Sequence, residues 1–70
     1  MHISYNKLQK LMIDNKMKRS DLKRAAQISD YTATKINKNE PISIETIMRI
    51  CKVFHCDIGD IMEIILDENN

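Results

Sequence analysis

Hydrophobic positions recur at helical spacing along most of this chain. The clearest stripe begins at Ile44 and continues through Ile47, Met48, Cys51 and Phe54, which lie on one face if the segment is a helix. Shorter stripes of the same kind occur on both sides of it. This pattern predicts five short helices, at about residues 3–15, 18–26, 30–37, 44–55 and 58–65.

Polar residues at the segment ends support these boundaries. Ser29, Ser43 and Asp57 each stand just before a predicted helix, where a short side chain can accept a hydrogen bond from a free backbone amide. Pro41 ends any helix before it, because proline disfavours the helical conformation in the preceding residue. The second helix would begin after Lys18, a poor capping residue, so its start is the least clearly marked.

The composition points to one helical domain spanning residues 1–70. A chain of 70 residues has room for one domain at most. A single Gly and a single Pro argue against a β-rich fold with many tight turns. No segment is predicted to be a strand. We therefore expect an all-α protein, a compact five-helix bundle with an aliphatic core, since there is no Trp and aromatic residues make up 4%.

The net charge of +1 hides an uneven distribution. Residues 1–40 contain nine Lys and Arg against four Asp and Glu, a balance of +5. Residues 41–70 contain two Lys and Arg against six Asp and Glu, a balance of −4, and the two balances sum to +1. A chain of this kind can present a basic face to a polyanion while it stays nearly neutral overall.

Several classes of protein are disfavoured by what the sequence lacks. No apolar run approaches the roughly 18 residues of a membrane span, and the first residues do not resemble a signal peptide. Two cysteines are too few for a disulfide framework and suit a reducing compartment. These features favour a cytoplasmic protein.

One cluster has the residue types of a metal site. Cys51, His55 and Cys56 fall within six positions, but zinc sites usually need a second pair of ligands elsewhere, and Cys51 belongs to the apolar stripe. Gly59 stands alone and forms no phosphate-binding loop, and no signature of an activated nucleophile is present. We predict no metal, no cofactor, no small-molecule ligand and no enzymatic activity.

The polar face of the segment at residues 30–37 is unusual for a plain bundle helix. Its sequence "DYTATK" carries hydrogen-bonding groups on short side chains, including two threonines that do not favour helix formation. Such groups can contact bases or phosphates. From composition alone, a nucleic-acid surface and a solvated surface both remain open.

The last predicted helix, at 58–65, has more apolar residues than one face needs. Ile64 and Leu66 extend the apolar character beyond the stripe formed by Ile58, Ile61 and Ile65. Two interpretations remain open: the surplus covers a second copy of the chain, or the domain simply exposes a few aliphatic side chains.

The order of these elements resembles a known family. The segments "MKRSDLKRAAQIS", "DYTATKINKNEPISIETIMRICKVFHC" and "DIGDIMEII" are similar to the phage-repressor-like (Xre/Cro-type) helix-turn-helix regulators, especially their small stand-alone members. The resemblance covers about residues 5–65. It implies a lambda-repressor-like DNA-binding domain whose third helix enters the major groove of double-stranded DNA.

The resemblance also implies roles for particular residues. Base contacts fall on the third helix, at Asp30, Tyr31, Thr32, Thr34 and Lys35. Contacts with the sugar-phosphate backbone fall on the preceding helix, the cap and the following loop, at Arg19, Ser20, Ser29, Asn37, Lys38 and Asn39. Ala33 and Ile36 match buried positions of the family.

The sequence departs from the family pattern at three positions. Gln27 replaces the glycine that is common at the turn, and a left-handed turn without glycine costs on the order of 1 kcal/mol. Lys23 replaces a small residue, so its stem must lie along the surface or the two helices must open slightly. Asp30 brings a carboxylate to the groove, where it can accept from a cytosine amino group but repels phosphate.

Two hypotheses about function follow. The first is a sequence-specific DNA-binding transcriptional regulator, with repression as the expected mode, acting as a homodimer through the C-terminal helix. The alternative is a protein-interaction module or antitoxin that uses the same fold. It is motivated by the acidic second half of the chain and by the extra aliphatic residues near Ile64.

Overall fold

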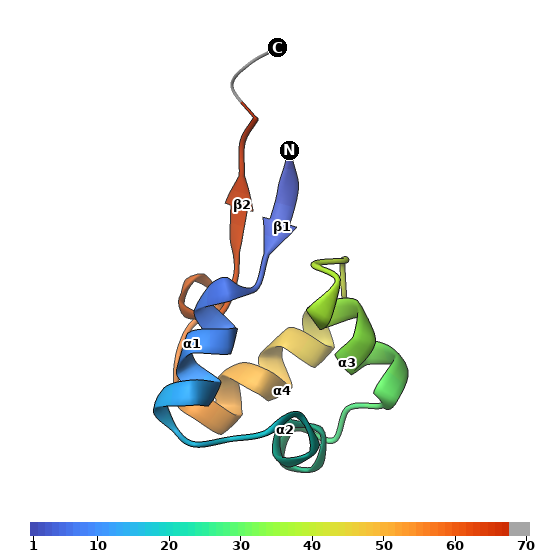
Figure 1. The fold of residues 1–70 in the computed structure, drawn as a ribbon, viewed down its shortest axis with the longest axis vertical. Helices are drawn as coiled ribbons and strands as arrows, with labels where there is room; N and C mark the ends of the chain where they lie inside the picture. The colour runs from blue at the N-terminus through green and yellow to red at the C-terminus, as the bar shows by residue number, and fades with distance from the viewer. Residues whose placement is uncertain (68–70) are drawn as a thin grey trace.

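Four α-helices and a two-stranded ribbon make up the described part of the chain (Figure 1). The computed structural model describes residues 1–67; positions 68–70 of the predicted single domain lie outside the described residues. The elements in chain order are β1 (His2–Ser4), α1 (Asn6–Asp14), α2 (Arg19–Ala26), α3 (Asp30–Asn37), α4 (Ile44–Phe54), the 3-10 turn η1 (Ile58–Asp60) and β2 (Glu63–Ile65).

The three central helices agree with the sequence prediction. The α2, α3 and α4 helices begin and end within one residue of the predicted ranges 18–26, 30–37 and 44–55. Ser43 caps α4 as expected, because its Oγ accepts from the amide of Thr46 at 3.1 Å. Local signals were sufficient here, since serines mark the starts of α3 and α4 and apolar residues at helical spacing mark all three helices, although Lys18 marks the start of α2 poorly.

The prediction of five helices without strands is wrong at both ends of the chain. The helix predicted at 3–15 begins only at Asn6, and the helix predicted at 58–65 is reduced to η1. The residues left over form β1 and β2, which pair antiparallel with Ile3 opposite Ile64 (Figure 1). Backbone hydrogen bonds between these two distant segments replace the helical bonds that each would otherwise make alone.

Ile61 explains why the second segment turns away from a helix. Its side chain is fully buried, and its carbonyl accepts a 3.2 Å hydrogen bond from the amide of Leu8 in α1. The carbonyl therefore bonds to α1 and not to an amide one turn further along its own segment. The chain then leaves the body of the protein as β2.

The core lies between the helices and is mainly aliphatic, as predicted. Its most deeply buried side chains are Tyr5, Leu8, Ile50 and Ile61. Around them pack Met12, Leu22, Ala26, Ile28, Ala33, Ile36 and Ile47. The burial of Ala33 and Ile36 confirms their assignment to the core. The fold is therefore mostly helical, with a small antiparallel strand pair added.

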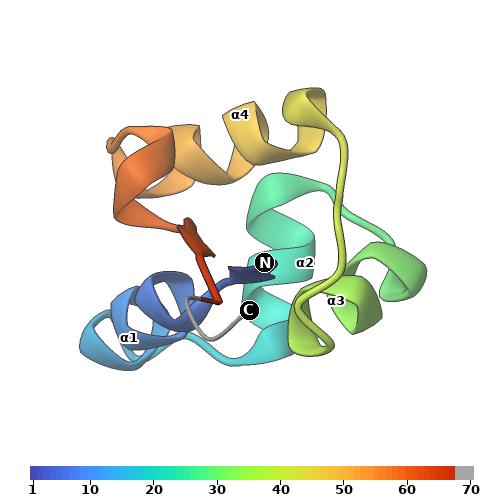
Figure 2. The same ribbon diagram turned by 90° about the horizontal axis from the view of Figure 1, so that it is seen from above.

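The arrangement of the helices leaves α3 at the edge of the protein. In the view from above, α2 lies in the middle with α4 on one side, and α3 lies beyond α2 (Figure 2). The α2 helix packs against both α3 and α4. One long side of α3 is therefore free of covering elements. Within residues 1–67, no helix has the length and apolar character needed to cross a membrane.

Candidate nucleic-acid interface

The turn between α2 and α3 adopts the left-handed conformation without a glycine. Gln27 has φ 55° and ψ 50°, and the amides of Gln27 and Ile28 both donate to the carbonyl of Lys23. The buried side chain of Ile28 then anchors the turn in the core. The turn thus has the shape that glycine would favour, at a conformational cost on the order of 1 kcal/mol.

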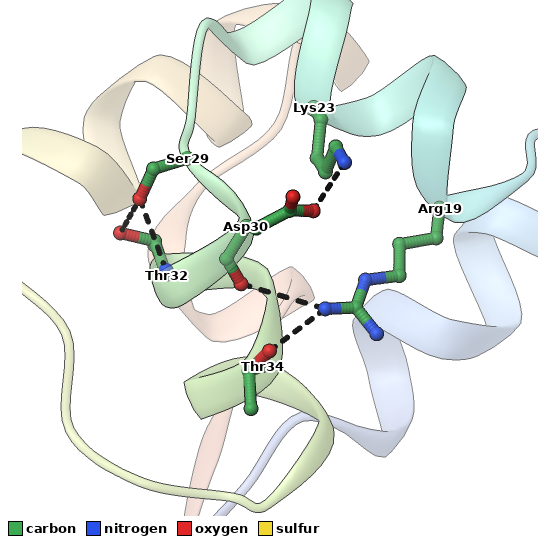
Figure 3. A network of polar contacts seen from close by, with 6 residues as sticks. All are labelled: Arg19, Lys23, Ser29, Asp30, Thr32 and Thr34. Atoms are coloured by element: carbon green, nitrogen blue, oxygen red, sulfur yellow. Dashed lines mark hydrogen bonds and ion pairs between the residues drawn. The ribbon is translucent and has the colours of Figure 1, made fainter.

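Ser29 begins α3 as its N-cap, as the sequence predicted. Its Oγ accepts from the amide of Thr32 at 3.2 Å and donates to Thr32 Oγ1 at 3.2 Å (Figure 3). The two hydroxyl groups therefore order one another at the start of the helix. Ser29 is exposed and Thr32 half-buried, so both remain accessible from outside.

Arg19 connects the first turn of α2 to α3. Its Nη2 donates to Thr34 Oγ1 at 2.8 Å and to the main-chain carbonyl of Asp30 at 3.4 Å (Figure 3). Nε and Nη1 of the same guanidinium make no hydrogen bond within residues 1–67 and remain available. Arg19 therefore holds α3 in place while it keeps two nitrogens for another acceptor.

Lys23 and Asp30 form a second connection between the two helices. Lys23 Nζ donates to Asp30 Oδ1 and makes an ion pair with it (Figure 3). This hydrogen bond, followed by the charge of Lys23, holds the pKa of Asp30 below its usual value. Two of the departures from the family pattern therefore act together, because the long side chain at position 23 meets the carboxylate at position 30.

Tyr31 and Lys35 occupy the exposed side of α3. The Nζ of Lys35 lies 4.9 Å from the centre of the Tyr31 ring, within cation–π range. Tyr31 is 71% exposed, so this pair presents an aromatic edge and a positive charge to the surroundings. The pair lies one turn apart on the helix, and each side chain limits the freedom of the other.

The loop after α3 is fixed by its own asparagines. Asn39 has φ 57°, and its Oδ1 accepts from the amide of Tyr5 at 3.0 Å. Asn37 Oδ1 accepts weakly from Gln9 Nε2, at 3.5 Å. Lys38 between them is exposed, and its ammonium group has no polar partner within residues 1–67. The loop therefore offers one uncommitted cation on a well-positioned backbone.

The structure brings most of the predicted contact residues together. Arg19 and Asn37 line one hollow between α1, α2 and α3, and Arg19 contacts α3 directly. Ser20 lies exposed on the first turn of α2, where its hydroxyl makes no hydrogen bond with the described residues. Sequence reasoning missed Lys23 and Tyr5 as supports of this surface, because their partners lie on other elements.

The cysteine cluster is separate from this surface. Cys51 and Cys56 are both free thiols and half-buried. Burial raises the pKa of both, which favours the protonated thiol over the thiolate that a metal would need. Among residues 1–67, no group of three or more His, Cys, Asp or Glu side chains is arranged to hold a metal ion.

Comparisons with known proteins agree with the observed geometry. The sequence profile of the Cro/C1-type helix-turn-helix DNA-binding domain matches residues 7–67. The crystal structure of the transcriptional regulator VanUg, in its form II, is 42% identical to this chain with a TM-score of 0.89. That match covers 94% of this chain and 88% of the other. A search of curated proteins finds no match.

Proposed function

This chain belongs to the Cro/C1-type helix-turn-helix family and is a DNA-binding transcriptional regulator. From this premise, we propose that it represses transcription by placing α3 in the major groove of DNA. The observation that carries the proposal is the double attachment of α3 to α2. Hydrogen bonds from Arg19 and Lys23 fix the helix, while its polar side stays open to solvent.

Base reading is proposed for the exposed side of α3. The residues concerned are Asp30, Tyr31, Thr32, Thr34 and Lys35. The first turn supplies a carboxylate, a phenol and a hydroxyl, which together offer both acceptors and donors to base edges. Thr34 accepts from Arg19, so its methyl group is the part left for a thymine methyl.

Phosphate binding is proposed for the residues on either side of α3. They are Arg19 and Ser20 on α2, Ser29 at the cap, and Asn37, Lys38 and Asn39 in the loop. Arg19 has two free nitrogens and the ammonium group of Lys38 has no polar partner within residues 1–67, so these two side chains carry the charge of the interaction. The backbone amide of Asn39 donates to Ile36 and its Oδ1 accepts from Tyr5, so its Nδ2 is the donor left for a phosphate.

Selection of bound sites from random duplexes tests this function directly. We expect a two-fold symmetric consensus with half-sites about one helical turn apart. The selected duplex and a scrambled one are then titrated at two salt concentrations. Affinity that stays weak and equal for both duplexes at low salt would rule out a sequence-specific regulator.

A palindromic site calls for two copies of the chain, and we propose that β2 carries their contact. The predicted C-terminal helix does not form, but its apolar residues remain exposed on and after β2. Ile64 is 53% exposed and Leu66 is 64% exposed. Burying such side chains against their copies stabilises a dimer by removing apolar surface from water.

Sedimentation equilibrium of Ile64→Lys tests the dimer. We expect the substitution to produce monomers at concentrations where the wild type is dimeric. Ile13→Lys is the matched control, because Ile13 is 75% exposed but lies at the far end of α1. A dimer that survives Ile64→Lys would exclude this contact.

The alternative role as a protein-interaction module is favoured by one surface. Ile44 and Met48 are exposed on α4 and, with Ile58, line an apolar groove whose floor includes the buried Ile47. If this role is correct, a partner protein co-purifies in stoichiometric amount and is lost with Met48→Lys. Specific DNA binding that persists in Met48→Lys would separate the two roles.

A further inference from the structure

We propose that Lys23 is a positioning residue that holds the carboxylate of Asp30 for a cytosine in each half-site. This inference rests on the proposed function, because it assumes that α3 enters the major groove. It adds Lys23 to the residues that determine specificity and names the base that Asp30 reads.

Asp30 occupies the position on α3 from which a side chain reaches base edges. It is the first residue of the helix, and its side chain is 78% exposed. The first residues of a recognition helix are those closest to the bases. The ion pair with Lys23 favours the carboxylate form, and an ionised carboxylate enters the groove as an acceptor only.

The two carboxylate oxygens of Asp30 have different surroundings. Oδ1 accepts from Lys23 Nζ, whereas Oδ2 has no hydrogen-bond partner within residues 1–67. Lys23 approaches from α2, so the paired oxygen faces α2 and the other oxygen is left open. One acceptor is therefore presented in a fixed direction.

The chemistry of the major groove selects the partner of such an acceptor. Guanine presents two acceptors there and thymine presents one, so both repel a carboxylate. Adenine has an amino donor, but its neighbouring N7 is an acceptor. Cytosine presents an amino donor alone. An ionised Asp30 therefore favours cytosine over the other three bases.

Lys23 also reduces the repulsion between the Asp30 carboxylate and the DNA phosphates. An unpaired carboxylate near DNA is repelled by the phosphates, which lowers affinity for every sequence. The side chain of Lys23 is 30% exposed and ends at Asp30, so its charge offsets that repulsion where it arises. Arg19 holds the main-chain carbonyl of Asp30 at 3.4 Å, which fixes the same residue from its backbone side.

Binding of four variants to a panel of duplexes tests the proposal. The panel contains the selected operator and all its single-base substitutions, and the variants are Asp30→Asn, Lys23→Met, Lys23→Arg and the double variant Lys23→Met with Asp30→Asn. We expect Asp30→Asn to lose about 10-fold of discrimination for cytosine at one half-site position. Lys23→Met should lose discrimination at that same position, and Lys23→Arg should retain most of it.

The double variant separates positioning from a simple change in charge. If Lys23 acts through Asp30, the double variant discriminates no less than Asp30→Asn alone, because the second substitution has nothing left to position. Lys52→Met is the control for the loss of one positive charge, since Lys52 lies exposed on α4. Thermal unfolding of each variant sets a temperature at which all are folded.

The outcomes distinguish failure of this inference from failure of the proposed function. A wild type that binds every duplex equally overturns the proposed function and this inference with it. A wild type that discriminates, together with Asp30→Asn that keeps the full cytosine preference, overturns only the inference. Lys23→Met that weakens all duplexes by one factor, with discrimination unchanged, also overturns it.

Discussion

The hydroxyl of Tyr5 donates a 2.7 Å hydrogen bond to the main-chain carbonyl of Glu40. The amide of Tyr5 donates to Asn39 as well, at 3.0 Å. Burial raises the pKa of Tyr5, so its hydroxyl keeps the proton that it donates. A residue before α1 thus fixes the loop that follows α3, although it lies outside the proposed interface.

Tyr5→Phe should therefore destabilise the protein. The substitution removes the part-buried hydrogen bond to the carbonyl of Glu40, at a cost of about 1 kcal/mol in the free energy of unfolding. Urea denaturation measures this change. Tyr31→Phe is the matched control and should change stability by less than about 0.5 kcal/mol, because Tyr31 is exposed. Equal losses in the two variants would contradict the assignment.

Lys38→Ala should weaken binding to all duplexes alike. A cation that contacts phosphate contributes to affinity by releasing counterions, so its removal should reduce the slope of log K against log salt by about 1. Titrations at several salt concentrations measure the slope. Lys52→Ala, on the exposed side of α4, should leave the slope unchanged. A reduced slope in both variants would mean that the effect comes from the lower net charge of the protein and not from a phosphate contact of Lys38.

The titration of Asp30 should depend on Lys23. Pairing stabilises the carboxylate, so the folded-state pKa lies below the unfolded one, and NMR titration of Lys23→Met should find it raised toward the usual range. The stability that the pair contributes is present above the unfolded-state pKa and is lost as the pH falls through the folded-state pKa. An unchanged Asp30 titration in Lys23→Met would mean that the pair does not form in solution.

Gln27→Gly should stabilise the turn of the helix-turn-helix unit. Gln27 holds φ 55°, which glycine adopts without strain, so the free energy of unfolding should rise by up to about 1 kcal/mol. Thermal or urea denaturation measures the difference. Ala25→Gly in α2 should act in the opposite direction by a similar amount, because glycine weakens a helix interior. A loss of stability in Gln27→Gly would show that the Gln27 side chain makes a contact whose stabilising free energy exceeds the backbone strain at φ 55°.

The parts of the fold that were predictable from the sequence are those with local signals. Ser29 and Ser43 mark the starts of α3 and α4. The stripe from Ile44 shows the helical period of α4 but not its buried side, because Ile44 and Met48 are exposed whereas Ile50, which is not on the stripe, is fully buried. The run from Ile61 to Ile65 has no such signal. Its apolar residues suit a helix face and a short strand equally well, and only pairing with β1 decides between them.

The candidate site also has a part that was predictable from the sequence and a part that was not. Its surface residues follow from the resemblance, but the attachments among them do not. Lys23 looked like a misfit because sequence alone does not show that it reaches Asp30. The hydrogen bonds from Tyr5 to Asn39 and Glu40 join positions more than thirty residues apart, so no local pattern indicates them.

The pairing of β1 with β2 has a consequence for the order in which the protein assembles. Closing a loop that contains all four helices is entropically costly until those helices have packed, so the ribbon should form last and open first. Native-state hydrogen exchange should then find the amides of Ile3 and Ile64 exchanging well before that of Ile50 in α4. If β2 carries the dimer contact, the least protected part of the monomer is also the part that a second copy would stabilise.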